Sequence, residues 1–93
     1  MVRMTDKAIN FCIKRKELIK NPILNEKLYL SNQGFSEISS LGRFTNVKAL
    51  FLSGNSIYKI ANLEALRQLH DLNLSDNKIG KNSVSVRLHI RLN

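Results

Sequence analysis

The sequence predicts an α/β solenoid, in which short units stack into a right-handed superhelix with a short parallel sheet on its concave face. Two observations predict this fold. The stretches 28–49, 50–71 and 72–80 align at a period of 22 residues, and the same apolar columns recur in them. Each stretch also opens with the alternation Leu-x-Leu, which is the pattern of a half-buried strand. A unit this short cannot bury its own apolar side, so the units must stack.

The predicted strands supply both a core and a binding face. The two leucines of each strand, Leu28 and Leu30 in the first unit, point into the core. The residues beside them point to the concave face, and they are the candidate protein-binding residues: Lys27, Tyr29, Ser31, Ala49, Phe51, Ser53, Asp71, Asn73 and Ser75. Tyr29 and Phe51 occupy equivalent positions on adjacent strands, so their rings should be neighbours. Exposed aromatic pairs anchor protein interfaces, although such rings also stack merely to shield a sheet.

The turn after each strand carries an amide side chain. Asn55 and Asn77 stand there in the second and third units, and Gln33 stands there in the first. An asparagine amide both donates and accepts, so it can satisfy backbone groups of its own turn and of the adjacent unit. Gln33 is one methylene longer, which predicts a looser first turn.

The return segment of each unit has an apolar residue at every third position. This spacing predicts a helical or 3₁₀ return on the convex side. Residues 61–70 have the stronger helix propensity. The columns are Ile38, Leu41, Phe44 and Val47, repeated as Ile60, Leu63, Leu66 and Leu69.

Residues 1–24 are predicted to form an N-terminal capping helix and a linker. The helix spans 5–20, with Thr5 as its N-cap, and Asn21-Pro22 stops it. Its apolar side is predicted to cover the first unit, as a cap must in a solenoid. A helix on a membrane surface is the alternative. That apolar side comprises Ala8, Phe11, Cys12, Leu18 and Ile19, with Ile9 and Ile13 at its margin.

The repeats, residues 25–80, amount to about two and a half units, and residues 81–93 form an atypical tail. From Val84 to Leu92 apolar residues alternate with polar and basic ones, as in a strand. Three hypotheses follow for the tail. It caps the last unit, it pairs with a second chain through residues 83–92, or it is a truncated, alternatively spliced or frameshifted end.

Composition and charge narrow the class of protein. The 93 residues make one small domain, no apolar run reaches about 18 residues, and Cys12 is the only cysteine. The start of the chain lacks the apolar core of a secretory signal, so we expect a cytoplasmic protein, with the nucleus as alternative. The net charge is +8, but the repeats 28–79 carry five basic and four acidic residues. The excess charge lies at the two ends, which argues against a nucleic-acid site on the repeats.

No constellation of reactive residues stands out. The chain has no Gly-rich phosphate loop, no histidine pair at metal-ligand spacing and no paired cysteines. The sequence therefore predicts a non-enzyme with no cofactor, no metal site and no small-molecule substrate. His70 is predicted to be a surface residue, and Cys12 a buried or half-buried helix residue.

The repeat unit resembles a known family. The pattern LxLxxNxIxxIxxLxxLxxLxx, carried by residues 50–71, resembles the 22-residue class of leucine-rich repeats. Residues 5–79, with LYL at 28–30, GF at 34–35 and NLEAL at 62–66, are similar to the start of the axonemal dynein assembly factors with leucine-rich repeats. The resemblance implies a protein-binding scaffold of the cytoplasm or cilium, without catalytic residues. An RNA- or ribonucleoprotein-associated module is the alternative, because the same repeat class includes a spliceosomal protein.

Overall fold

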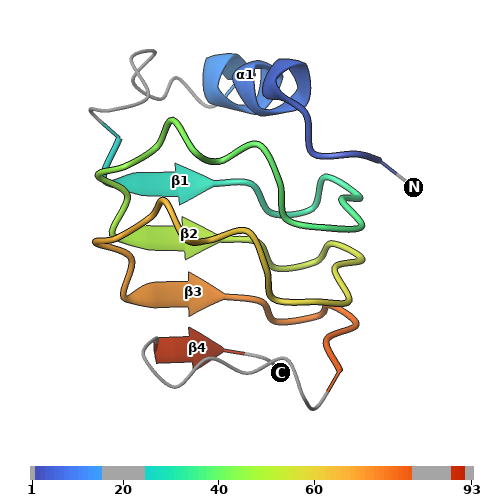
Figure 1. Cartoon of the computed structure of the whole chain (residues 1–93). Coiled ribbons are helices and arrows are strands. Elements are labelled where there is room, and N and C mark those ends of the chain that lie inside the picture. The colour runs from blue at the N-terminus through green and yellow to red at the C-terminus, as the bar shows by residue number, and fades with distance from the viewer. Residues whose placement is uncertain (1, 16–24, 81–88, 92–93) are drawn as a thin grey trace.

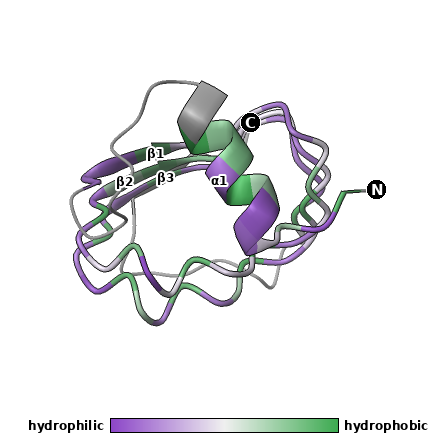
Figure 2. Ribbon diagram, turned by 90° about the horizontal axis from the view of Figure 1, so that it is seen from above, coloured by the Kyte–Doolittle hydropathy of each residue, from purple (hydrophilic) through white to green (hydrophobic). Residues whose placement is uncertain are grey.

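A computed structural model describes residues 2–15, 25–80 and 89–91, which form one helix and four short strands. The helix is α1 (Asp6–Arg15), and the strands are β1 (Lys27–Tyr29), β2 (Ala49–Phe51), β3 (Asp71–Asn73) and β4 (His89–Arg91). The strands lie side by side in the order β1-β2-β3-β4, and α1 lies beyond β1 (Figure 1). Seen along the stack, the strands form one side of the molecule and the return segments the other (Figure 2).

The sheet has the register that the period predicts. Leu28 pairs with Leu50, and Leu50 pairs with Leu72, in parallel strands. The ladder continues past the strands, since Leu30 N–H donates to the Phe51 carbonyl and Leu52 N–H to the Asn73 carbonyl, both at 2.8 Å. The six inward leucines are at most 1% exposed. The parallel sheet and its leucine core are thereby confirmed.

The period extends to the backbone conformation. The residue after Ser31, Ser53 and Ser75 is in each case left-handed: φ is 58° at Asn32, 70° at Gly54 and 58° at Asp76. A second left-handed pair, again 22 residues apart, is Ser40 at 61° and Asn62 at 62°. Glycine, asparagine and aspartate tolerate this region best, which accounts for four of these five residue choices.

The return segments contradict the predicted helix. Residues 36–48 and 58–70 contain no helix. They form successive separate turns, in which Phe44 N–H donates to the Leu41 carbonyl at 3.0 Å and Val47 N–H to the Phe44 carbonyl at 3.2 Å. The three-residue spacing of the buried side chains is confirmed. The hydrogen bonds join residues three apart, as in the 3₁₀ alternative, but they form separate turns and no continuous helix. Adjacent parallel strands are about 4.8 Å apart, whereas a helix with its side chains is about 10 Å wide, so slim turns stack more readily.

The N-terminal segment packs against the first unit. Val2 forms a parallel bridge with Phe35, and Ser39 Oγ donates to the Met4 carbonyl at 2.6 Å. The predicted N-cap is confirmed, because Thr5 Oγ1 accepts from Ala8 N–H at 3.1 Å. The end of the helix, predicted at residue 20, lies outside the described residues.

The buried side of α1 differs from the prediction. Ile9, Cys12 and Ile13 are at most 3% exposed and join the core, whereas Phe11 is 59% exposed. The buried position of Cys12 is confirmed, but Phe11 was wrongly placed in the core. Met4, just before the helix, is also buried. The helix therefore packs on the first unit through Ile9, Cys12 and Ile13, which join Met4 in the core. Leu18 and Ile19, on which the predicted stripe also rested, lie outside the described residues.

The tail contributes a fourth strand. Residues 89–91 pair in parallel with β3, and Ile90 stands opposite Leu72. The interval from Leu72 to Ile90 is 18 residues, so this strand joins the sheet earlier than the 22-residue period would place it. A strand that continues the sheet is therefore present within 81–93, as the first hypothesis for the tail expected.

Candidate protein-binding face

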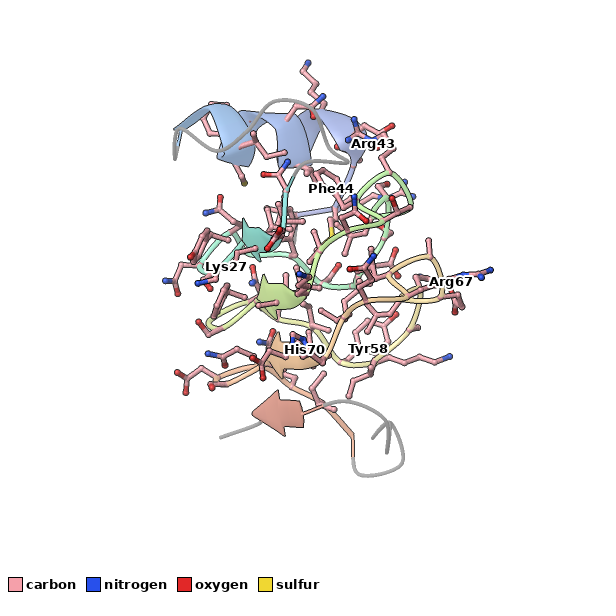
Figure 3. The ribbon with its side chains drawn as sticks, turned by 90° about the vertical axis from the view of Figure 1, so that its left-hand side faces the viewer. Lys27, Arg43, Phe44, Tyr58, Arg67 and His70 are labelled. Atoms are coloured by element: carbon pink, nitrogen blue, oxygen red, sulfur yellow. The ribbon has the colours of Figure 1, made fainter. Side chains whose placement is uncertain are left out.

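The candidate residues lie on the outer side of the sheet, which we call the strand face. We define it by Lys27, Tyr29, Phe51, Asp71 and Asn73, together with Ser31, Ser53 and Ser75. The burial pattern of β1, in which Leu28 is covered and its two neighbours are exposed, places these side chains opposite the core. Figure 3 shows Lys27 on the opposite side of the molecule from Arg67 of the second return.

Two stacked aromatic rings form the centre of the strand face. The ring centroids of Tyr29 and Phe51 are 4.8 Å apart, and the ring planes differ by 4°. Tyr29 is 36% exposed and Phe51 is partly exposed. The predicted contact between these rings is confirmed. The parallel register brings the two side chains directly beside each other, so neither ring needs the core for its placement.

One predicted member offers almost no surface. Ala49 stands in the same register column as Lys27 and Asp71, but it is only 7% exposed. Its methyl group is short and lies on a strand with neighbours on both sides, so the longer side chains around it cover it. Ala49 therefore offers little surface to a partner, and we leave it out of the strand face.

Two groups of hydrogen bonds lie where the strands end. One joins two of the serines, and the other joins Asn73 to the third serine. Ser53 Oγ donates to Ser31 Oγ at 3.0 Å, across a spacing of 22 residues. Asn73 Oδ1 accepts from the backbone N–H of Ser75 at 3.1 Å and from Ser75 Oγ at 2.6 Å. These bonds hold the turns that follow the strands.

An asparagine ladder supports the strand face from inside. Asn55 Oδ1 accepts from the backbone N–H groups of Gln33 and Phe35, both at 3.0 Å. Asn55 Nδ2 donates to the Leu30 carbonyl of the previous unit at 3.0 Å and to the Leu52 carbonyl at 2.8 Å. Bridging between adjacent units, as predicted for the asparagines, is confirmed.

The next rung of the ladder repeats this arrangement. Asn77 accepts from Ile57 N–H at 2.9 Å and donates to the Leu52 carbonyl at 2.7 Å. Gln33 uses its amide within its own turn, donating to the Ser31 carbonyl at 2.9 Å. The looser first turn stays a prediction.

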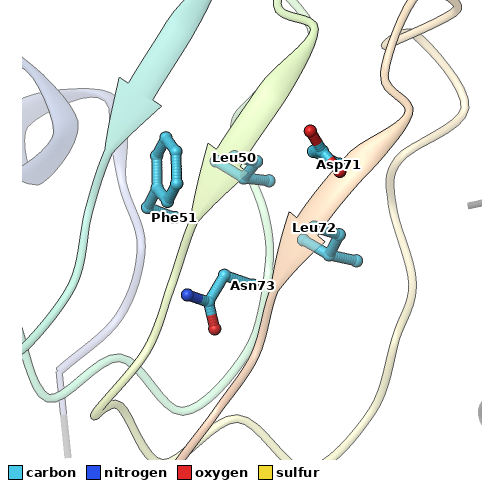
Figure 4. Close-up of a pocket in the computed structure, with 5 residues that line it drawn as sticks. All are labelled: Leu50, Phe51, Asp71, Leu72 and Asn73. Atoms are coloured by element: carbon cyan, nitrogen blue, oxygen red, sulfur yellow. The ribbon is translucent and has the colours of Figure 1, made fainter. Parts of the chain in front are cut away.

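A small hollow lies beside Phe51. Its volume is about 70 Å³, and it is lined by Leu50, Phe51, Asp71, Leu72 and Asn73 (Figure 4). The hollow therefore lies between β2 and β3, on the side of Phe51 away from Tyr29. Sequence reasoning missed this hollow, because it depends on how the side chains of β2 and β3 pack against one another.

Charged residues flank the sheet where the strands begin. Lys48 Nζ lies 3.6 Å from Glu26 Oε1, in a pair whose side chains are about half exposed or more. His70 is exposed, as predicted, and its Nδ1 lies 2.8 Å from the Lys48 carbonyl oxygen. Exposed pairs of this kind add little to stability.

Other classes of site find no support in the described part of the chain. Over residues 2–15, 25–80 and 89–91, no three histidine, cysteine, aspartate or glutamate side chains gather as metal ligands would. Within the same ranges no helix is long and apolar enough to cross a membrane.

Comparison with known proteins agrees with the repeat pattern. The chain is 40% identical over 63 residues to leucine-rich repeat-containing protein ODA7 of Chlamydomonas reinhardtii. The aligned residues cover 68% of this chain and 15% of that protein. It is 44% identical over 55 residues to the dynein axonemal assembly factor 1 homolog of Drosophila melanogaster, covering 59% of this chain and 4% of that protein. The chain is therefore similar to a leucine-rich repeat-containing protein and to a dynein axonemal assembly factor.

A third relative shows the same relation. The dynein axonemal assembly factor 1 homolog of Aedes aegypti is 38% identical over 55 residues. This chain spans between 4% and 15% of the length of these three relatives. None of their names refers to RNA. No protein-family model matches the sequence. No solved structure matches it either.

Proposed function

We propose that this chain is a protein-interaction module, a leucine-rich repeat solenoid whose strand face binds a protein partner during the assembly of axonemal dynein. The observation that carries the proposal is the stacked and exposed pair Tyr29–Phe51. Aromatic side chains are enriched at the energetic centres of protein interfaces, where they bury a large area at little cost in conformational entropy.

Three further observations support the proposal. The core is already filled by the inward leucines, so the aromatic pair is not needed to complete it. One named relative is a leucine-rich repeat-containing protein and the other two are dynein axonemal assembly factor 1 homologs, and an assembly factor must bind proteins. The strand face also holds few charges, which suits a protein partner better than a nucleic acid. The cytoplasm or the cilium is the compartment where this partner would be met.

Capture from an extract of ciliated cells tests the proposal. Immobilised chain should retain axonemal dynein subunits, identified and quantified by mass spectrometry. The double change Tyr29→Ala with Phe51→Ala should lower the retained amount at least about tenfold, as expected for loss of an aromatic hot spot. The thermal midpoint should change little, because the rings lie outside the core.

The matched control is Tyr58→Ala. Tyr58 is 55% exposed and lies on the return side, away from the strand face (Figure 3). It should leave capture unchanged. If the double variant retains dynein subunits as well as the native chain does, the strand face is not the binding surface and the proposal fails.

A further inference from the structure

The aromatic column of the strand face stops at β3. Tyr29 and Phe51 stack, and the next position in their register is Asn73. The oxygen of the Asn73 amide is held by two hydrogen bonds from Ser75. The amide oxygen is thereby tied to its own turn, and Asn73 and Phe51 both line the hollow that Figure 4 shows.

The hollow joins two groups that attract a cation. Tyr29 covers one face of the Phe51 ring, so the hollow on the β3 side adjoins the other face. An aromatic ring face carries partial negative charge. Asp71 adds a carboxylate to the same hollow. Together they offer a flat surface beside a negative charge.

Asp71 is also the only acidic position of the four paired strands. Its neighbours along the register are Ala49 on β2 and His89 on β4, and β1 contributes Lys27 at the same level. A single acidic position on an otherwise neutral or basic face gives a cationic ligand one defined place to bind.

We propose that the hollow receives an arginine side chain of the protein partner. The inference rests on the proposed function, because it names the group that the strand face would recognise. A guanidinium is planar, so it can extend the Tyr29–Phe51 stack while its N–H groups donate to Asp71. A carboxylate accepts several hydrogen bonds, so Asp71 can take this group in addition to its present contacts.

A small arginine compound tests the hollow without any dynein subunit. The ¹⁵N-labelled chain is titrated with N-acetyl-arginine amide, and the backbone amide shifts are followed by NMR. The matched compound is N-acetyl-citrulline amide, which has nearly the same shape without the charge. The arginine compound should shift the amides of Phe51, Asp71 and Asn73. It should bind about three- to tenfold more tightly than the citrulline compound.

Two variants separate the carboxylate from net charge. Asp71→Asn should weaken the arginine compound to the level of citrulline. Asp76→Asn removes the same charge from an exposed turn whose left-handed backbone suits asparagine, so it should leave binding unchanged. The amide spectrum of each variant shows whether its fold is kept. The comparison of the two compounds on the native chain tests the inference even if a variant does not fold.

Several outcomes would overturn the inference. They are an absence of shifts in the native chain, equal binding of the two compounds, or undiminished arginine binding by Asp71→Asn. Such a result leaves the proposed function standing if Tyr29→Ala with Phe51→Ala still lowers the capture of dynein subunits at least about tenfold. Conversely, arginine binding in the hollow would persist even if capture proved independent of the aromatic pair.

Discussion

Asn55 shows at the scale of one residue how the repeat is held together. The residue is 6% exposed, and its amide bonds backbone groups of its own unit and of the previous one. Among the described residues no buried side-chain nitrogen or oxygen lacks a partner. The backbone groups of the turn are shielded from water and require hydrogen-bond partners. An asparagine at this position supplies them, and an apolar residue could not.

Replacing Asn55 by alanine should unfold much of the domain. The change leaves two backbone N–H groups and the Leu30 carbonyl without this partner, whereas the Leu52 carbonyl keeps its bond from Asn77. The expected cost is about 3 kcal/mol or more in the free energy of unfolding. The measurement is urea unfolding followed by circular dichroism. Asn46→Ala is the control, because Asn46 also bonds across 22 residues, to Gln68 at 3.2 Å, but in an exposed place. A similar loss for both variants would show that burial of the ladder is not the cause.

Helix α1 and the return segments show what is settled at the scale of elements. Each turn of a return places one side chain inward, which the three-residue spacing alone revealed. The helix is different, because its apolar residues include Phe11 as well as Ile9, Cys12 and Ile13, and helical spacing alone does not say which of them are buried. Contact with the first unit selects the stripe of Ile9, Cys12 and Ile13.

A pair of substitutions in α1 tests this selection. Ile9→Ala should lower the free energy of unfolding by about 2–5 kcal/mol, because it leaves a cavity in the core. Phe11→Ala removes a larger side chain that is mostly exposed, so it should cost less than about 1 kcal/mol. Thermal and urea unfolding of the two variants measure the difference. The reverse order would mean that the helix docks by the side that the sequence pattern first indicated.

At the scale of the whole molecule, protection of the sheet from association depends on which strands cover its edges. β4 pairs with β3 through Asp71–Asn73, so the tail occupies an edge that would otherwise present free backbone groups. Self-association through residues 83–92 stays a prediction. The pairing of β4 with β3 gives the tail another role, which is to cover the edge of the sheet.

Deletion of residues 82–93 distinguishes these two uses. If the tail chiefly covers β3, the shortened chain should melt at a lower temperature and form larger species, because its last strand has an open edge. Light scattering after size-exclusion chromatography measures the mass, and differential scanning calorimetry the thermal midpoint. A native dimer that becomes a monomer on deletion would instead support association through the tail.

The sequence by itself determined the repeat, the strand positions, their register, the leucine core, the asparagine ladder and the contact between Tyr29 and Phe51. All of these follow from equal spacing, because equivalent residues of stacked units must lie side by side. The tertiary structure alone decided the buried side of α1, the cover over Ala49, the slim turns of the returns, the pairing of β4 and the hollow beside Phe51. Each of these depends on the space left by neighbours from elsewhere in the chain, and a periodic pattern carries no measure of that space.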